Sequence, residues 1–280
     1  MARGSLRRRN RKVGLNILIS FILLFYIFPL YYVLNNAFKA SEYISRQPFY
    51  LTPGTFSLNN ITEAFNQMNY INSFYNSTVV LIMAMALLVI AGSLAGFGIT
   101  YARNRTLNRF YLGYIALISM PLQIAMVPLM KLMRDFSLTN THLGMALIYS
   151  AIYMPFVIFL YTGFMRSVPR DLIDAAKIDG CNPAGIYYRV FMPLLTTITG
   201  MVIIIRGVSA WNDLFVPLIV VSRANMYTLT QQLYVFASSR IGRWDMIFGA
   251  TFLCIIPIMV LFLAMQKTFI KGIMAGSIKG

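Results

Sequence analysis

The sequence predicts an all-α membrane protein with six transmembrane helices. Of its 280 residues 58% are hydrophobic and 11% are charged, and the mean hydropathy is +0.67, whereas soluble domains carry about 25% charged residues. The apolar residues gather in long blocks, and a block of about 18 or more is typical of a membrane-spanning helix. Because backbone polar groups in lipid must be satisfied internally, such blocks are expected to be helical.

Six blocks are long enough to cross a hydrocarbon core of roughly 30 Å. In chain order they are Val13–Leu34, Phe74–Tyr101, Phe110–Met130, Leu143–Met165, Ile198–Val221 and Met246–Met265. The first follows a basic segment, residues 1–12, as the apolar part of a signal peptide would. It is too long for that role and no small-x-small cleavage pattern follows it, so we interpret it as an uncleaved helix. Residues 35–73 are polar, and we expect them to form a small external cap of short helices.

The Lys and Arg residues predict the topology, because cytoplasmic loops are enriched in them. With residues 1–12 inside, the cytoplasmic segments carry sixteen Lys and Arg residues and the external segments carry seven. Both termini, including the tail 266–280, are therefore predicted to be cytoplasmic. Although the net charge is +16, the basic residues lie between hydrophobic blocks and not on a folded polar surface. We therefore expect membrane lipid around this chain and no nucleic acid as a partner.

Motifs for catalysis and metal binding are missing from the sequence. There is no P-loop for nucleotide phosphates and no cluster with metal-ligand spacing. The single histidine, His142, falls in a predicted external loop, where we expect it to be solvated. We expect no catalytic residue, no metal site and no cofactor bound by this chain. The pair Gly92 and Gly96 fits the small-xxx-small packing pattern, either inside one bundle or against another subunit.

A polar loop between the fourth and fifth blocks, residues 167–195, predicts two short helices at a sharp angle. Pro169 suits the first turn of one helix, and Gly180 is placed as the C′ residue that ends it. Asn182 can cap the second helix, with Pro183 at its first position. These signals indicate a compact protrusion and not a flexible linker.

The first of these helices has features of a docking surface for another protein. Ala175 and Ala176 leave low relief, so that a partner can approach closely, and Asp174 and Asp179 offer acceptors for basic groups on that partner. An amphipathic helix lying on lipid is the alternative interpretation. The carboxylates and the alanine pair favour a protein socket.

This loop resembles the EAA loop of ABC importer permeases. That pattern runs Glu-Ala-Ala, then Gly after three residues, then a distal Ile/Val-x-x-Pro; here the matching positions are Asp174, Ala175, Ala176, Asp179, Gly180 and Val190–Pro193. Pro193 also marks where the second helix gives way to the fifth block. Two departures are Asp174, one methylene shorter than Glu, and Thr197, where many members have a second proline.

The likeness extends to nearly the whole chain and is greatest to the MalG-like carbohydrate permeases. Its further matches are Trp211, Asn212, Asp213, Pro217, Gly242–Asp245 and the tail Phe269–Gly280. The resemblance implies a MalG-like type I ABC importer permease fold in a prokaryotic inner membrane and carbohydrate import by ATP-driven alternating access. It leaves open which sugar is carried, and whether it is neutral or anionic.

The resemblance also implies the partners and the residues that contact them. The partners would be a sister permease in a heterodimer, two ATPase subunits that bind ATP and Mg²⁺, and an external solute-binding protein. The ATPase would be contacted through the loop residues Asp174, Ala175, Ala176, Asp179 and Gly180. The last residues of the tail, Lys279 and Gly280, would reach between the ATPase subunits.

Arg206 and Asp213 are the charged residues that fall well inside a predicted span. Seven residues apart, nearly two helical turns, they share one face, and intramembrane charges usually face a cavity or a partner. We predict that this face lines the translocation pathway or the contact with the sister permease. The alternative is that Asp213 lies near the membrane edge and Arg206 extends toward it. Further candidates for the pathway are Gln123, Ser209, Trp211 and Asn212.

Two other function classes compete with the importer hypothesis. A secondary transporter would work without an ATPase, and it predicts inverted repeats or proton and cation relays inside the membrane. A membrane-embedded hydrolase predicts a buried nucleophile and base. The sequence shows neither pattern clearly.

Overall fold

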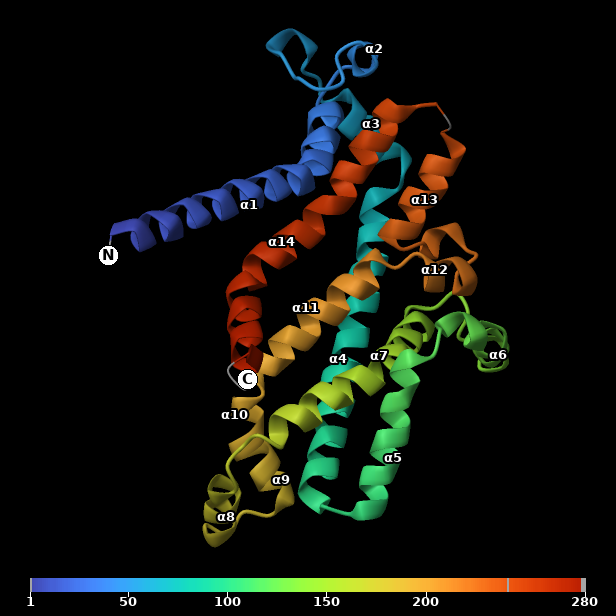
Figure 1. Cartoon of the computed structure of the whole chain (residues 1–280). Coiled ribbons are helices and arrows are strands. Elements are labelled where there is room, and N and C mark those ends of the chain that lie inside the picture. The colour runs from blue at the N-terminus through green and yellow to red at the C-terminus, as the bar shows by residue number, and fades with distance from the viewer. Residues whose placement is uncertain (1, 241, 278–280) are drawn as a thin grey trace. The chain divides into compact units, whose positions relative to one another are not determined.

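The computed structural model describes residues 2–240 and 242–277, and these divide into two compact units. Unit 1 contains the residues up to 69 together with 235–256, and unit 2 contains 70–234 and the residues from 257 onward. Both units are helical (Figure 1). Across the described ranges, the strand-like pairing is limited to an isolated bridge between Lys39 and Phe56.

Unit 1 begins with a long apolar helix and continues with short ones. The most apolar stretch of the candidate span Gly14–Ala37 buries no residue against the rest of the chain. Residues 35–73, for which the sequence predicts a cap of short helices, begin at the end of this span and continue beyond it. The elements of this unit are α1 (Ala2–Ala37), α2 (Ser41–Ile44), the 3-10 turn η1 (Pro53–Thr55), α3 (Asn59–Gln67), and the first part of α14 (Trp244–Ser277).

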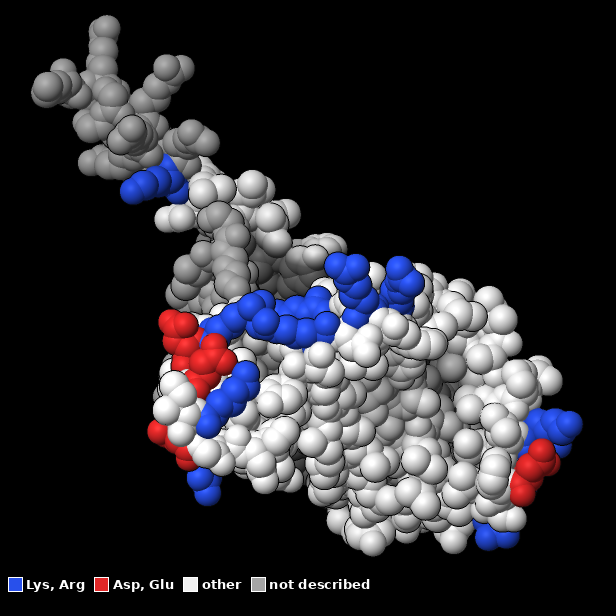
Figure 2. Space-filling view, turned by 90° about the horizontal axis from the view of Figure 1, so that it is seen from below, with Lys and Arg blue, Asp and Glu red and all other residues white. Residues whose placement is uncertain are grey.

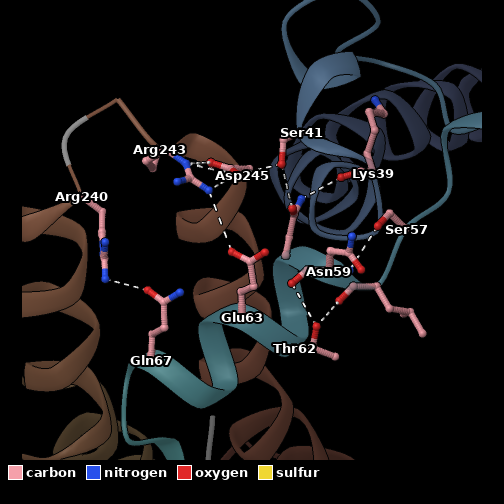
Figure 3. A network of polar contacts seen from close by, with 12 residues as sticks. Lys39, Ser41, Ser57, Asn59, Thr62, Glu63, Gln67, Arg240, Arg243 and Asp245 are labelled. Carbon is pink, nitrogen blue, oxygen red and sulfur yellow. Dashed lines mark hydrogen bonds and ion pairs between the residues drawn. The ribbon is translucent and has the colours of Figure 1, made fainter.

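A network of polar contacts ties the start of α14 to the short helices (Figure 3). The carboxylate of Asp245 is 6% exposed and accepts hydrogen bonds from Ser41 Oγ at 2.8 Å and from Arg243 Nη2 at 2.8 Å. Arg243 also lies 4.0 Å from Glu63. The hydrogen bond to Asp245 raises the pKa of the Arg243 guanidinium. A buried carboxylate needs such a partner, because its desolvation is otherwise costly.

Close packing holds α14 against α3. A Cβ atom at Gly249 would lie 2.3 Å from the carbonyl oxygen of Asn60, so only glycine allows this approach. Lys39, which the topology prediction counted among the external basic residues, is fully buried, and burial lowers its pKa. Its Nζ donates to the carbonyl oxygen of Gln47 and to Asn36 Oδ1.

Unit 2 is organised around α4 (Tyr70–Ala102) and α7 (His142–Met165), with α11 (Thr196–Asn212) packed against both (Figure 1). A Cβ atom at Gly92 would lie 2.6 Å from Val157 Cγ1, and one at Gly96 would lie 2.9 Å from Tyr161 Cβ. The two glycines therefore let α4 and α7 approach closely. Of the two roles predicted for this pair, packing within the bundle is the one that the structure shows.

The predicted third span, Phe110–Met130, is not a single helix. Its first part is α5 (Arg105–Ala116), which the 3-10 turn η2 (Leu117–Ser119) continues, and its second part is α6 (Leu122–Asp135). The chain bends by 103° between the two parts. The break falls at Met120, whose ψ of 125° is extended and which precedes Pro121. Proline disfavours helical geometry in the preceding residue, so the helix stops at Met120. The apolar pattern of the sequence nevertheless continues through this position.

The predicted fifth span, Ile198–Val221, is also interrupted. Helix α11 ends at Asn212, and α12 (Phe215–Val220) begins after an extended Asp213 with φ −72° and ψ 131°. The Asp213 carboxylate accepts the backbone N–H groups of Phe215 at 3.3 Å and Val216 at 2.9 Å. Aspartate starts a new helix here because its carboxylate satisfies amides that otherwise have no intrahelical acceptor.

The number of membrane spans depends on how the bent helices are counted. Four helices in the described residues are each long and apolar enough to cross a membrane: α1, α4, α7 and α14. Two bent pairs raise the number to six if each pair is one span. One pair joins α5 to α6, and the other joins residues 183–194 to α11 at 68°.

His142 differs from its expected solvated loop position. It is the first residue of α7 and is partly buried, and its Nε2 lies 2.8 Å from Asn76 Oδ1 on α4. Its ring also meets Tyr75 edge to face, with 6.0 Å between centroids. The histidine therefore joins two helices of unit 2.

Candidate functional site

The loop between α7 and α11 begins with a short helix whose two ends are set by local sequence. Helix α8 (Arg170–Ile178) has Pro169 as its N-cap residue, one position ahead of the first turn in which it was expected. At the other end, Gly180 has φ +78°, and its N–H donates to Lys177 O at 3.0 Å. The N–H of Cys181 donates to Ala176 O at 2.9 Å. This pair of bonds is a Schellman motif, which places Gly180 at C′ as its sequence position predicts.

A second short helix follows directly. The side chain of Asn182 accepts the N–H of Gly185 at 2.7 Å, and Pro183 is the first residue of α9 (Pro183–Ile186). The chain continues through the π-helical turn η3 (Tyr187–Phe191) and α10 (Met192–Leu194), which contains Pro193, before α11 begins. The predicted cap and proline positions thus lie at the start of α9.

Aromatic residues anchor this loop to α4. Tyr187 Oη lies 2.7 Å from Ser93 Oγ, and both residues are buried. Phe97 packs against the rings of Tyr187 and Phe191 with centroid distances of 5.3 and 5.4 Å. Sequence reasoning did not identify these contacts, although spacings of four residues on both segments indicate facing helical positions.

The two alanines of α8 have different surroundings. Ala176 is buried in the core of unit 2, and Ala175 is exposed. The expectation that both leave low relief for a partner is therefore wrong for Ala176, because it faces the supporting helices. Nearby, Leu172 and Ile178 are 47% and 87% exposed. These two apolar side chains were not singled out in the sequence, because the sequence of α8 alone does not show which of its apolar residues are exposed.

The carboxylates of α8 lie at the surface. Asp174 Oδ1 is 3.1 Å from Lys177 Nζ, and both side chains are at least half exposed. An exposed ion pair of this kind contributes about 0–1 kcal/mol, so it can be exchanged for another partner at little cost. Asp179 is exposed at the C-terminal end of the helix. The helix thus presents carboxylates beside exposed apolar side chains.

A second group of candidate residues lies between α7 and α11. The Arg206 guanidinium carbon is 3.8 Å from the ring centroid of Phe156 and 5.0 Å from that of Tyr153. Tyr149 stacks on Tyr153 at 6.0 Å and donates its hydroxyl to Asp213 Oδ2 at 2.9 Å. Arg206 and Asp213 therefore contact one aromatic row of α7, at its positions 149, 153 and 156, and do not pair with each other.

The Arg206 side chain keeps one polar atom without a partner. Its Nε is buried and makes no hydrogen bond in the part of the chain that the structure describes. Cation–π contacts of the kind it makes with the α7 rings contribute about 0.5–2 kcal/mol each. The guanidinium is thus held in place by aromatic faces.

The other predicted pathway residues have local roles. Ser209 Oγ donates to Ile205 O at 2.7 Å, and Asn212 Nδ2 donates to Val208 O at 3.1 Å. Trp211 is buried and meets Phe74 of α4 edge to face at 6.0 Å. Gln123 is exposed on α6, and no hydrogen bond joins it to this group. Lys279 and Gly280 lie outside the described residues.

Comparison with known proteins decides the family. Residues 89–274 match the family described as the binding-protein-dependent transport system inner membrane component. The chain belongs to this family. The predicted all-α permease fold and the resemblance to ABC importer permeases are therefore confirmed, and the protein is a membrane permease component.

This permease aligns over almost its whole length with several named relatives. It is 33% identical to the melibiose/raffinose/stachyose import permease protein MelC of Bacillus subtilis, over 90% of this chain and 91% of that protein. It is 30% identical to the arabinooligosaccharides transport system permease protein AraQ of the same organism, over 96% of both chains. It is 29% identical to the lactose transport system permease protein LacG of Rhizobium radiobacter, over 98% and 99%.

A solved structure shares the fold of the permease. It is the crystal structure of a bacterial ABC transporter involved in the import of the acidic polysaccharide alginate, with a TM-score of 0.80. The sequences are 18% identical, and the match covers 92% of this chain and 96% of the other. At this identity the likeness concerns the fold.

Proposed function

We propose that this permease carries a carbohydrate across the inner membrane as one half of an ATP-driven importer that works by alternating access. The observation that carries the proposal is the surface of α8, where Ile178 and Leu172 are exposed beside carboxylates. Such a surface offers another protein both apolar area to bury and charges to pair. The hydrogen bond between Tyr187 and Ser93 connects this loop to α4, so a displacement of α8 can be transmitted to the membrane helices.

In this proposal the partners are a sister permease, two ATPase subunits and an external solute-binding protein. The ATPase subunits bind ATP and Mg²⁺, and this chain contributes no catalytic group and no cofactor. The α8 end of the molecule and both termini face the cytoplasm, which the excess of Lys and Arg in those segments supports. The tail residues Lys279 and Gly280 reach toward the ATPase.

The residues of the loop divide into two proposed roles. Asp174, Ala175 and Asp179 are exposed and contact the ATPase directly. Ala176 and Gly180 act on the shape of the loop, the first through its buried contact and the second through its positive φ. Asp174 exchanges its partner Lys177 for a basic group of the ATPase.

A small oligosaccharide is the proposed cargo. The names of the relatives MelC, AraQ and LacG, which concern sugars of this size, support it. The partly exposed Arg206 guanidinium can donate to a sugar hydroxyl, and the row of aromatic rings on α7 can pack against a sugar face. This arrangement supports a place for α7 and α11 beside the pathway.

Uptake in proteoliposomes tests the proposal. The chain is reconstituted with a sister permease, an ATPase and a binding protein from the same organism, and entry of labelled raffinose and lactose is measured with and without ATP. We expect uptake to require ATP and the ATPase. Uptake that persists without the ATPase would instead establish a secondary transporter.

The Arg206→Ala variant tests the pathway residues in the same assay. Loss of cation–π contacts worth about 0.5–2 kcal/mol each predicts a severalfold or greater fall in uptake. Arg206→Lys should retain part of the activity, because the charge stays near the α7 rings. Arg223→Ala, which removes an exposed arginine outside this group, is the control. Normal uptake by Arg206→Ala in a fully assembled complex would remove Arg206 from the pathway.

A further inference from the structure

A large basic cavity lies beside α8, where the end of α4 turns into α5. Its volume is about 910 Å³, and the end of α7 completes its wall. Six cationic residues line it, against a single carboxylate, that of Asp174. Figure 2 shows basic side chains gathered in a band on this face of the molecule. The six are Arg103, Arg105, Arg109, Arg166, Arg170 and Lys177.

Only some of these basic side chains have a hydrogen-bond or ion-pair partner within the described chain. Lys177 pairs with Asp174, and Arg166 Nη2 donates to Asn108 Oδ1 at 2.7 Å. The four remaining arginines of the cavity have no carboxylate partner among the described residues. One of them, Arg103, has φ +46°, a conformation that non-glycine residues rarely adopt. A cavity with this charge is complementary to an anion with several acceptor oxygens, such as a phosphate ester.

An apolar groove adjoins the basic cavity along α5. It has a volume of about 560 Å³, and its wall includes Phe110, Tyr114 and Leu117. Phe110 is 73% exposed, so the groove is open to the outside of the helix. Arg109 lines both the groove and the cavity, so the two adjoin at this residue. A free phosphate would use only the cavity, whereas a molecule with an anionic head and a hydrocarbon chain would use both.

We propose that this combined site binds an anionic phospholipid of the cytoplasmic leaflet. The phosphate of the headgroup lies among Arg103, Arg105 and Arg109, and an acyl chain follows the apolar groove on α5. Basic pockets between membrane helices on the cytoplasmic side suit such headgroups. The proposal rests on the proposed orientation, in which the α8 end is cytoplasmic. Because Asp174 and Lys177 of α8 line the same cavity, the bound lipid also holds α8 in place.

Native mass spectrometry of the purified full-length chain, without ATPase, tests the site. The probes are phosphatidylglycerol, phosphatidylcholine of the same chain length, and inorganic phosphate. We expect retention of phosphatidylglycerol over phosphatidylcholine, and a loss of at least about tenfold in the Arg103→Gln/Arg105→Gln/Arg109→Gln variant, since each basic residue near a lipid surface contributes about fivefold. The matched control, Lys131→Gln/Arg134→Gln on α6, should retain the lipid like the wild type.

A second variant tests the acyl groove. Phe110→Asp places a charge beside it, and we expect retention to fall although the basic cavity is intact. Equal retention of both lipids, or an unchanged triple arginine variant, would overturn the proposal. Displacement of the lipid by millimolar phosphate would show a site for soluble anions, and its displacement by added ATPase would show a protein-docking surface; either result would also overturn it. Failure of sugar uptake would not affect these measurements, which need no transport.

Discussion

Replacing Gly180 by valine is the sharpest test of how α8 is held. The residue has φ +78°, and a Cβ atom built on it meets nothing within 4 Å. A clash between this Cβ atom and neighbouring atoms is therefore not the source of the expected effect. The remaining cost is in the backbone, because a left-handed conformation costs an L-residue roughly 1–2 kcal/mol. For a β-branched residue the conformation is a clear outlier.

The variant can relieve this strain by giving up the helix end. That would sacrifice the Gly180 and Cys181 hydrogen bonds at 3.0 and 2.9 Å, each with a net contribution of about 0.5–1.5 kcal/mol. Both routes cost about 1–3 kcal/mol, which is less than the stability of a typical fold, about 5–15 kcal/mol. We therefore expect a protein that assembles but whose α8 is reoriented.

The assay compares ATP hydrolysed with sugar imported in proteoliposomes containing the complete transporter. For Gly180→Val we expect uptake to fall while ATPase activity remains, so that more ATP is spent per sugar. Gly180→Asn is the matched variant, because asparagine tolerates the left-handed region, and it should stay close to the wild type. Normal coupling in Gly180→Val, or an equal defect in Gly180→Asn, would refute the argument that the backbone conformation of Gly180 matters.

Two further predictions concern stability. Gly96→Ala should destabilise the chain by about 1–3 kcal/mol through overpacking, since its Cβ would lie 2.9 Å from a Cβ on α7. Gly98→Ala, which meets nothing within 4 Å, should be neutral or stabilising; equal melting temperatures for the two variants would contradict this. Arg243→Gln should lower the melting temperature more than Asp245→Asn, because it leaves a buried carboxylate without its cation. The reverse order would show that the cation does not compensate for burial of Asp245.

Local signals in the sequence predicted local geometry well. The end of α8 at Gly180 and the cap at Asn182 depend on residues within four positions of each other, so their spacing carries the information. The apolar blocks indicated helices because their hydropathy is likewise a property of consecutive residues. The breaks at Met120 and Asp213 were missed because hydropathy continues through them, and a single proline or aspartate decides the backbone there.

Contacts between distant segments could not be predicted in this way. The sequence singled out Arg206 and Asp213, but nothing in their spacing indicated that both meet the aromatic row of α7. Likewise, the bond between Ser93 and Tyr187 joins residues 94 positions apart. The contacts of such pairs follow from how helices pack, which depends on side chains of both partners.

The bond between Ser41 and Asp245 has a consequence for the order of events during synthesis. The two residues are separated by 204 positions, so the polar network of Figure 3 cannot close until almost the entire chain has left the ribosome. The apolar stretch of α1, which buries no residue against the chain, needs no such delay. A ribosome stalled shortly before codon 245 should therefore carry a chain whose first helix is formed and whose network between residues 41 and 245 is still open.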